Sequence, residues 1–261
     1  NAVSLMDENI KQYDDLQTDR DKFLKSSKSV IDKKIRELLG IGNATKMTVQ
    51  LLSETAERDY KLIKYQLLRD SEMAVPVVVL IPDKATAKSP VRFILTENGK
   101  SDFLGEVSNI ASAITDGTIL ACADLRGLGE TIDPASYNDA KYWNFEYRNA
   151  MLAMHCGKPI VGQRVQDILS IVEFIANEKA LKGRAINLKA DGIYSVPAIH
   201  AAVLEKNIAS CEVSHCIKTY KSYLENPLQY DMYSNVIYGV LKYYDLSDLI
   251  RLSERRARFA D

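Results

Sequence analysis

The sequence lacks the long apolar run that a membrane-spanning helix needs, and its first residues lack a signal-peptide pattern. It also lacks an excess of one charge, since 34 Lys and Arg residues stand against 35 Asp and Glu residues and the formal net charge is −1. A balanced charge gives no reason to expect nucleic acid or a membrane surface as a partner, and we predict neither. The first residue is asparagine rather than methionine, so we expect a processed or trimmed product.

Cysteine is scarce, and the motifs that carry metal or phosphate chemistry are absent from the sequence. The cysteines show no CxxC pair and no zinc spacing, and their positions do not reveal the redox compartment. We interpret all four as buried thiols: Cys122, Cys156, Cys211 and Cys216. The run GKS at 99–101 is too short to indicate a phosphate-binding loop. We therefore predict no cofactor and no metal site.

What the sequence does contain is typical of a globular α/β protein. Apolar residues make up 46% of the 261 residues, which is enough to bury a sizeable core. Residues 7–39 are highly charged and repeat apolar residues at helical spacing before Gly40. The apolar stripe consists of Ile31, Ile35, Leu38 and Leu39. We predict an amphipathic helix that packs on the body of the protein, with a dimerisation helix as the alternative.

The rest of the chain alternates strand-like and helix-like segments. Residues 47–55 and 60–70 alternate in a strand-like way and predict an antiparallel hairpin at a sheet edge. Continuous apolar strands that alternate with helices then predict a mostly parallel sheet covered on both faces. The strands are expected at 75–82, 91–99, 118–127 and 185–191, and the helices at 106–117 and 161–180. We divide the chain into a helix and hairpin extension, 1–70, and a main α/β domain, 71–261.

A strand, a tight glycine turn and a helix follow one another between Ala185 and Ile208. The strand ends at Asp191, the turn contains Gly192, and Pro197 falls in the first turn of the helix, where its missing N–H leaves nothing unpaired. An α/β-hydrolase places its nucleophile in this context. The motif G-x-S-x-G that normally carries the nucleophile does not occur anywhere in the sequence.

Several short runs together resemble the acetyl-xylan-esterase-like branch of the α/β-hydrolases. They are IRELLGI at 35–41, VPVVVLIPD at 75–83, ADLRGLGET at 123–131, KPIVGQRVQDILSIVEFI at 158–175, HAAVLEKNI at 200–208 and LKYYDLSDLI at 241–250. The resemblance implies an α/β-hydrolase fold and a serine esterase that removes acyl groups from plant polysaccharides. It also implies a periplasmic or extracellular location and an acylated polysaccharide or oligosaccharide as partner.

The resemblance places Gly192 at the position of the nucleophilic serine. Glycine adopts the strained turn of an elbow readily, but it has no oxygen with which to attack. Ser195 is the nearest hydroxyl and the fallback nucleophile. Because a serine in the first turn of a helix more often caps backbone N–H groups, we interpret Ser195 as a capping or exposed residue.

The base and the acid of a triad are also missing from the expected places. In this fold the histidine follows the acid, yet no histidine occurs after His215. We interpret His215 as a buried strand residue, His200 as a packing or solvent residue, and His155 as an exposed loop residue. Compared with the family, the chain ends at Asp261, before the segment that supplies acid and histidine. We expect the final C-terminal elements to be lacking, which would leave an open sheet edge.

Two further groups of residues correspond to loops beside the active site of the family. The loop after the run VRFILT at 91–96 offers oxyanion donors, and the candidates are Asn98, Gly99 and Lys100. A second group matches structural positions, and we expect its members to hold loops through ion pairs and carbonyl contacts. It consists of Asp124, Arg126, Arg164 and Asp167.

The segment 218–246 is rich in tyrosine, and in the family an excursion here shapes the substrate entrance. Tyrosines suit sugar rings because they stack and form hydrogen bonds. The candidates for a ligand platform are Tyr220, Tyr223, Tyr230 and Tyr233. Packing of this excursion onto the domain is the alternative.

These observations lead to three functional hypotheses. The first is a non-catalytic esterase-like protein that acts as a binding or interaction module. The second is an active serine esterase whose remaining triad residues lie outside this sequence, with Ser195 as nucleophile. The third is a structural subunit that forms a homo-oligomer through its N-terminal helix or its open sheet edge.

Overall fold

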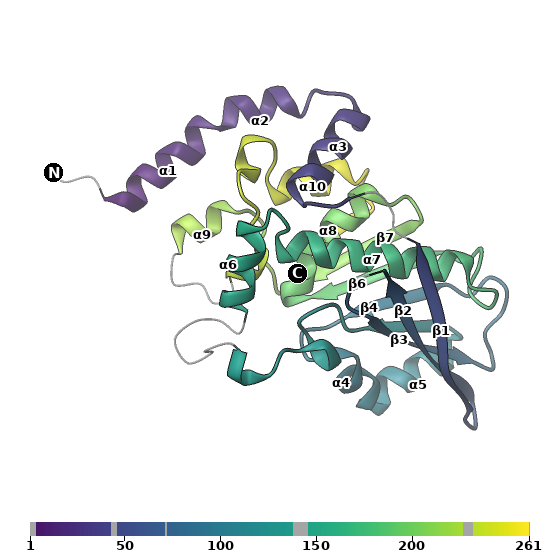
Figure 1. Ribbon diagram of the computed structural model, residues 1–261. Coiled ribbons are helices and arrows are strands. Elements are labelled where there is room, and N and C mark those ends of the chain that lie inside the picture. Colours follow the sequence, from purple (N-terminus) through teal and green to yellow (C-terminus); the bar gives the residue numbers. More distant parts are fainter. Residues whose placement is uncertain (1–3, 43–45, 71, 138–145, 227–231, 261) are drawn as a thin grey trace.

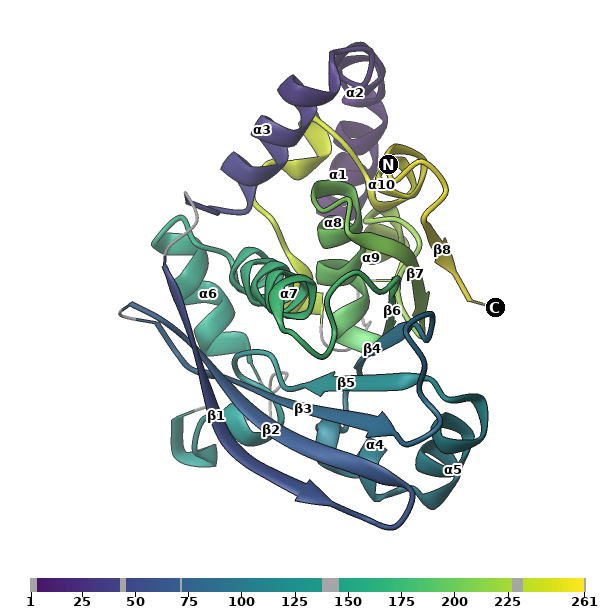
Figure 2. The ribbon, with the colours of Figure 1, turned by 90° about the vertical axis from the view of Figure 1, so that its right-hand side faces the viewer.

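The computed structural model describes residues 4–42, 46–70, 72–137, 146–226 and 232–260, and its centre is an eight-stranded sheet with helices on both faces (Figures 1 and 2). The strand order is β1-β2-β3-β5-β4-β6-β7-β8. The strands are β1 Met47–Ala56, β2 Tyr60–Arg69, β3 Val75–Pro82, β4 Val91–Leu95, β5 Ile119–Ala123, β6 Ile186–Asp191, β7 Ile208–Ser214 and β8 Ala257–Phe259. The α/β class with a mostly parallel sheet, predicted from the alternation of segments, is confirmed.

The sheet combines an antiparallel part and a parallel part. Strands β1, β2, β3 and β5 pair antiparallel in turn, and β5, β4, β6, β7 and β8 pair parallel. The predicted hairpin is confirmed, because β1 and β2 pair from Met47–Arg69 to Ala56–Lys61 at one edge of the sheet. Strand β2 also pairs with β3, so the hairpin is continuous with the main sheet.

The helices lie on both faces of this sheet. Helices α7 and α8 cover one face, and α4 and α5 lie on the opposite face (Figures 1 and 2). Their bounds are α4 Gly99–Gly105, α5 Val107–Asp116, α7 Ile160–Asn177 and α8 Ser195–Leu204. The remaining helices are α1 Leu5–Asp15, α2 Gln17–Phe23, α3 Lys28–Leu38, α6 Tyr147–His155, α9 Lys221–Glu225 and α10 Leu246–Leu252.

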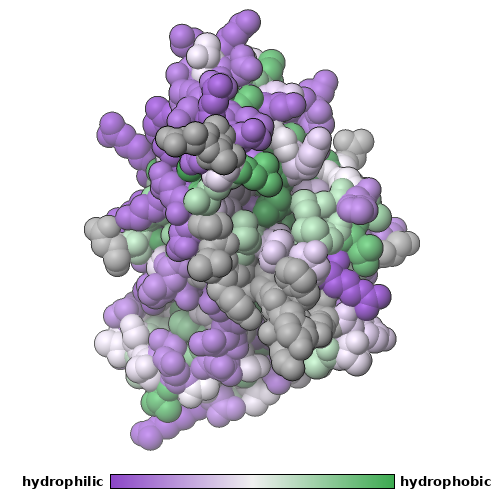
Figure 3. All heavy atoms as spheres, turned by 90° about the vertical axis from the view of Figure 1, so that its left-hand side faces the viewer, coloured by the Kyte–Doolittle hydropathy of each residue, from purple (hydrophilic) through white to green (hydrophobic). Residues whose placement is uncertain are grey.

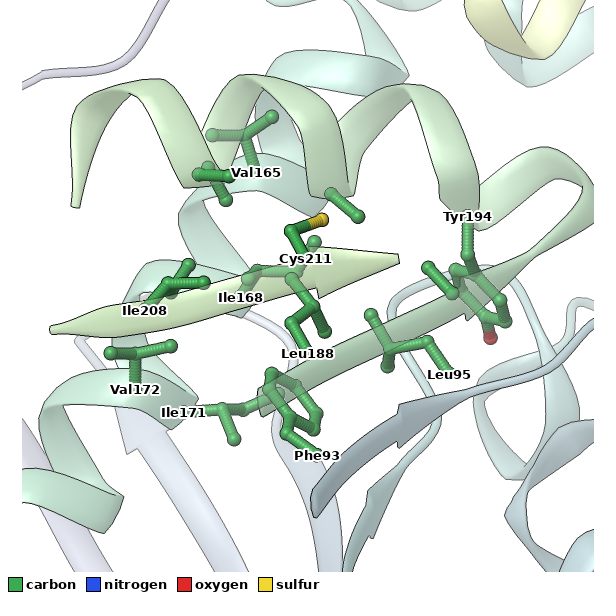
Figure 4. Packing of buried hydrophobic residues seen from close by; sticks show 14 of the residues in the cluster. Phe93, Leu95, Val165, Ile168, Ile171, Val172, Leu188, Tyr194, Ile208 and Cys211 are labelled. Carbon is green, nitrogen blue, oxygen red and sulfur yellow. The ribbon is translucent and has the colours of Figure 1, made fainter. Parts of the chain in front are cut away.

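The alternation of side chains along β4 builds two separate cores. Phe93 points to the α7 side and belongs to the main cluster, where it lies with Leu188 of β6 and Ile171 of α7 (Figure 4). Ile94 points the other way and belongs to a smaller cluster with Phe103 of α4. Burial on both faces explains why four of the five residues of this strand are apolar, with Arg92 as the exception.

The face on the α4 side changes character beyond β4. In β6 the buried residues alternate with partly or fully exposed polar residues, among them Lys189. Polar side chains pair across the strands on this face: Ser210 donates to Asn187 at 2.8 Å, and Arg258 donates to Glu212 at 2.5 Å. The sheet surface beside β4 is therefore polar where it is exposed to solvent, although the sequence analysis expected cover on both faces.

The N-terminal region is helical, as predicted, but the single stretch expected at 7–39 is divided into α1, α2 and α3. Helix α3 buries Ile31 and Ile35. Helix α1 buries none of its residues, and the upper part of Figure 3 shows that this region is mostly hydrophilic. Arg20 of α2 is buried and donates to the carbonyl of Leu241 at 2.9 Å, which ties the region to the body.

None of the described helices combines the length and the apolar character needed to cross a lipid bilayer.

Candidate functional site

The strand, turn and helix around Gly192 form an elbow at the end of β6. Gly192 has a φ of +58° and begins a short 3₁₀ turn, Gly192–Tyr194, that leads directly into α8. The sequence analysis predicted a positive φ at this position, and the prediction is confirmed. A positive φ strains any residue that carries a Cβ atom, so glycine suits the turn.

The side chain of Glu97 occupies the space beside Gly192. A Cβ atom on Gly192 would lie 1.8 Å from the Cδ and Oε1 atoms of Glu97, which is far inside van der Waals contact. Glu97 Oε1 also accepts the backbone N–H of Ile193 at 2.5 Å. In α/β-hydrolases the N–H that follows the nucleophile is an oxyanion-hole donor. A carboxylate therefore lies where the side chain of residue 192 would begin and uses the donor beside it.

The sequence analysis missed Glu97. It directly follows the run VRFILT at 91–96 and opens the loop considered for oxyanion donors, so its position was visible. Its contact with the elbow was not visible, because it depends on how closely β4 and β6 bring residues 97 and 192 together.

Two of the three candidate oxyanion donors after Glu97 already form hydrogen bonds within the protein. The N–H of Gly99 donates to the carbonyl of Thr96 at 3.0 Å, and the N–H of Lys100 donates to Asp124 at 2.8 Å. The Lys100 ammonium also donates to Asp124 at 2.7 Å, and both side chains are buried. Asn98 lines a cleft described below. A buried ion pair thus joins Lys100 to Asp124, the residue that follows β5.

The structural group Arg126, Arg164 and Asp167 lies together behind the elbow. Arg126 donates through Nε and Nη2 to the two oxygens of Asp167, at 2.8 and 2.6 Å. Arg164 is fully buried, donates to the backbone carbonyl of Arg126 at 3.1 Å and pairs with Glu146. Arg164 and Asp167 therefore both hold the loop at Arg126, and each does so through its own contacts.

Ser195 lies in the first turn of α8 and is fully buried. Its hydroxyl lies 2.9 Å from the carbonyl oxygen of Ser214 and 3.3 Å from that of Ala190. The prediction of a capping or exposed serine is wrong, because the hydroxyl donates to carbonyls of the adjacent strands and makes no cap hydrogen bond. These contacts tie the start of α8 to β6 and β7.

The histidines lie in three different surroundings. His200 is fully buried, and its Nδ1 lies 2.8 Å from the carbonyl of Val196 and its Nε2 3.2 Å from the Tyr244 hydroxyl. Burial lowers the pKa of His200 to about 4. His155 is exposed, as predicted, but it is the last residue of α6 instead of a loop residue.

His215 contradicts the prediction of a buried strand residue. Strand β7 ends at Ser214, and His215 follows with a φ of +48° and a side chain that is 84% exposed. Its Nδ1 lies 2.6 Å from Asp191 Oδ1, and this hydrogen bond raises the pKa of His215. Pairing between β6 and β7 stops at Asp191 and Ser214, so the chain leaves the sheet before His215 can be buried.

Asp191 and His215 form a carboxylate–histidine pair beside the elbow. No hydroxyl or thiol of a described residue forms a hydrogen bond with the other ring nitrogen of His215. Among the described residues, no group of three His, Cys, Asp or Glu side chains is arranged to hold a metal ion.

A cleft of about 360 Å³ opens between the elbow and helices α4 and α5. It lies on the polar side of the sheet, and Asp191 lines it next to Gly192. Its lining residues are Arg92, Ile94, Leu95, Thr96, Asn98, Asp102, Phe103, Glu106, Asn109, Lys189, Asp191 and Ser214. The mixture of charged, amide and apolar groups suits a polar organic ligand.

The tyrosine-rich segment packs mainly onto the domain. Tyr220 and Tyr223 are buried, and their rings lie 6.2 Å apart. Tyr233 is partly buried and makes an edge-on contact with the ring of Tyr147. Tyr230 lies outside the described residues. None of the described tyrosines of this segment lines the cleft beside Gly192, so a sugar platform in this segment stays a prediction.

No family model matches the sequence, and a search of curated proteins finds no match. Among solved structures, the whole chain superposes with a TM-score of 0.77 and 13% identity on 76% of a Bacteroides fragilis protein provisionally assigned as an acetyl xylan esterase. Acetyl Xylan Esterase 1 from Thermoanaerobacterium gives a TM-score of 0.55 and 10% identity, with 89% of this chain and 75% of that chain covered.

A glucuronoyl esterase from Solibacter usitatus gives a TM-score of 0.60 and 12% identity, with 90% of this chain and 75% of that chain covered. At identities this low, the similarity establishes a shared fold and nothing more. The chain has the α/β-hydrolase fold in the form found in these esterases, as the sequence predicted.

Proposed function

We propose that this α/β-hydrolase-fold protein is a non-catalytic relative of carbohydrate esterases that binds acylated polysaccharide or oligosaccharide. The observation that carries the proposal is the carboxylate of Glu97 beside Gly192. The elbow keeps its shape, but it presents a carboxylate where a serine esterase presents its hydroxyl.

Two features support the loss of ester hydrolysis. A serine esterase needs a hydroxyl that a histidine can deprotonate, and Ser195, the fallback nucleophile, is buried against two carbonyls. It also needs free N–H donors for the oxyanion, and Glu97 already accepts the N–H of Ile193. The negative charge of Glu97 would further oppose an oxyanion at the same place.

The choice of ligand is supported by the neighbours and by the cleft. The neighbouring structures include an acetyl xylan esterase and a glucuronoyl esterase. The cleft beside the elbow carries carboxylates and amides, which accept and donate hydrogen bonds to hydroxyl groups, and one aromatic ring, Phe103.

The test measures hydrolysis and binding on the same protein. We expect no turnover of p-nitrophenyl acetate or acetylated xylan beyond a weak residue, since removal of one triad member alone leaves only about 10³–10⁴-fold catalysis over water. We expect binding of an acetylated xylo-oligosaccharide in calorimetry. Clear turnover that Ser195→Ala abolishes would make Ser195 the nucleophile and refute the proposal. If the protein neither hydrolyses the esters nor binds the oligosaccharide, the proposal that it binds acylated glycans is refuted.

A further inference from the structure

The geometry points to the cleft between the elbow and α4–α5 as a binding site for a carboxylate-bearing sugar, that is, a uronic acid unit of an oligosaccharide. Arg92 would bind the carboxylate, and the carboxylates and amides around it would bind the hydroxyl groups. The inference rests on the proposed function for the class of glycan. It adds the location of the binding site, the negative charge of the ligand, and Arg92 as the residue that selects for that charge.

Arg92 is the first observation. It is the second residue of β4, is partly buried, and lines the cleft. It makes no hydrogen bond or ion pair with any residue that the structure describes. The arginines that are buried in the described chain donate to carboxylates or carbonyls: Arg20, Arg69 and Arg164. A guanidinium that is partly withdrawn from water and has no partner favours a ligand carboxylate, which it binds with two parallel hydrogen bonds.

The neighbours of Arg92 do not satisfy it, although acids are close. Lys189, two residue pairs along the β4–β6 ladder from Arg92, pairs with Glu212 at 3.5 Å. Asp191 accepts from Ser214 and lies against His215. Asp102 lines the cleft without a partner among the described residues. The two cations that line the cleft, Arg92 and Lys189, therefore lie on strands of the sheet, and Asp102 lies on helix α4.

This arrangement discriminates between classes of ligand. A compact anion such as phosphate would meet Arg92 but also the negative charges of Asp102, Glu106 and Asp191. A neutral sugar would use the carboxylates and amides but leave Arg92 unpaired. A uronic acid unit carries one carboxylate and several hydroxyl donors, so it matches both halves of the cleft.

The size and walls of the cleft agree with this ligand. Its volume of about 360 Å³ lies at the lower end of the roughly 300–1,000 Å³ typical of small-molecule sites. Phe103 offers a partly exposed ring on the α4 side of the cleft, and Asn98 offers an amide. The Nδ2 group of Asn109 already donates to the carbonyl of Phe103 and to Glu106, so its side-chain oxygen is the group left to accept from a ligand. Asp191 lines the cleft and is adjacent to Gly192 of the elbow, so a bound oligosaccharide would extend past Gly192.

The test is calorimetric titration with a xylotriose that carries one glucuronic acid branch and, separately, with unbranched xylotetraose. We expect the acidic sugar to bind the wild-type protein more tightly than the neutral sugar. We expect Arg92→Gln to weaken the acidic sugar about 10- to 100-fold, the range for a lost hydrogen bond to a charged group. The same variant should leave the neutral sugar unchanged. Its thermal stability should also be unchanged, because Arg92 has no partner to lose.

Arg58→Gln is the matched control, since Arg58 is exposed in the turn between β1 and β2 and likewise has no described partner. It should change neither affinity. No binding of the acidic sugar would overturn the inference, and so would equal binding by wild type and Arg92→Gln. If an acetylated neutral oligosaccharide binds while the acidic one does not, the inference fails and the proposed function stands. If the acidic sugar binds through Arg92 and esters are hydrolysed, the proposed function fails and the site remains.

Discussion

At the scale of single residues, Gly192 and Glu97 form a complementary pair. The missing Cβ of Gly192 makes room for a carboxylate, and that carboxylate binds the next backbone N–H. Elbow geometry and elbow chemistry are therefore separable in this protein: the positive φ is kept, and the hydroxyl is not.

We expect Gly192→Ala to lower the free energy of unfolding more than Gly183→Ala does. Both glycines have a positive φ, which costs an L-residue roughly 1–2 kcal/mol, but only a Cβ at 192 meets another group. Displacing Glu97 should add about 1 kcal/mol for the lost hydrogen bond. Urea denaturation of both variants measures the difference.

Adding Glu97→Ala to Gly192→Ala separates the two causes. When Glu97 has been replaced by alanine, the Cβ added at residue 192 has no carboxylate to displace. The losses of unfolding free energy from the two single substitutions should therefore not add up in the double variant. Equal costs at 183 and 192, with simple additivity for Glu97→Ala, would show that the carboxylate does not occupy this space in solution.

At the scale of elements, a buried ion pair joins the start of α4 to the loop after β5. Lys100 donates to Asp124 with both its backbone N–H and its ammonium, and Asp124 also accepts the N–H of Glu130. Breaking one partner of such a pair leaves an unpaired buried charge.

We expect Lys100→Met to lower the free energy of unfolding by about 3 kcal/mol, near the low end of the range for a broken buried pair because two N–H groups still reach Asp124. Lys61→Met, which removes the exposed pair with Glu54 on the hairpin, should cost about 0–1 kcal/mol. Chemical denaturation of both variants provides the comparison. Similar losses would mean that Lys100 is solvated in solution.

The elements were largely predictable from local patterns, and the contacts between them were not. The hairpin and β3 follow from strand alternation, and Gly192 follows from a turn signal between strand and helix. Helix α4 was missed because its seven residues begin and end with glycine, a poor helix former. The contact of Glu97 and the exposure of His215 depend on where neighbouring strands stop, which no local pattern records.

At the scale of the whole molecule, the buried His200 makes folding depend on pH. Burial lowers its pKa in the folded state to about 4, below the ordinary value of 6.5. Between these values the unfolded chain binds a proton that the folded chain excludes. Stability from this group is therefore complete above pH 6.5 and is lost as pH falls toward 4.

We expect the contribution of His200 to the free energy of unfolding to decrease by about 3 kcal/mol as the pH falls from 6.5 to 4. His200→Asn, which keeps an N–H for the carbonyl of Val196, should flatten the pH dependence in this window. The exposed His215, whose pKa is raised, acts in the opposite sense, with its contribution lost as pH rises. Denaturation at several pH values tests this, and an unchanged slope in the variant would exclude His200 as the source.

The contact between Glu97 and Gly192 also constrains how this chain could change over generations. A serine gained at 192 while Glu97 remains would meet the carboxylate and lose the bond to Ile193, so that single step is unfavourable. Loss of the Glu97 side chain first would open the space and free the donor. The order of the two substitutions therefore matters, and a mutational route that places a hydroxyl at this elbow begins in the loop after β4.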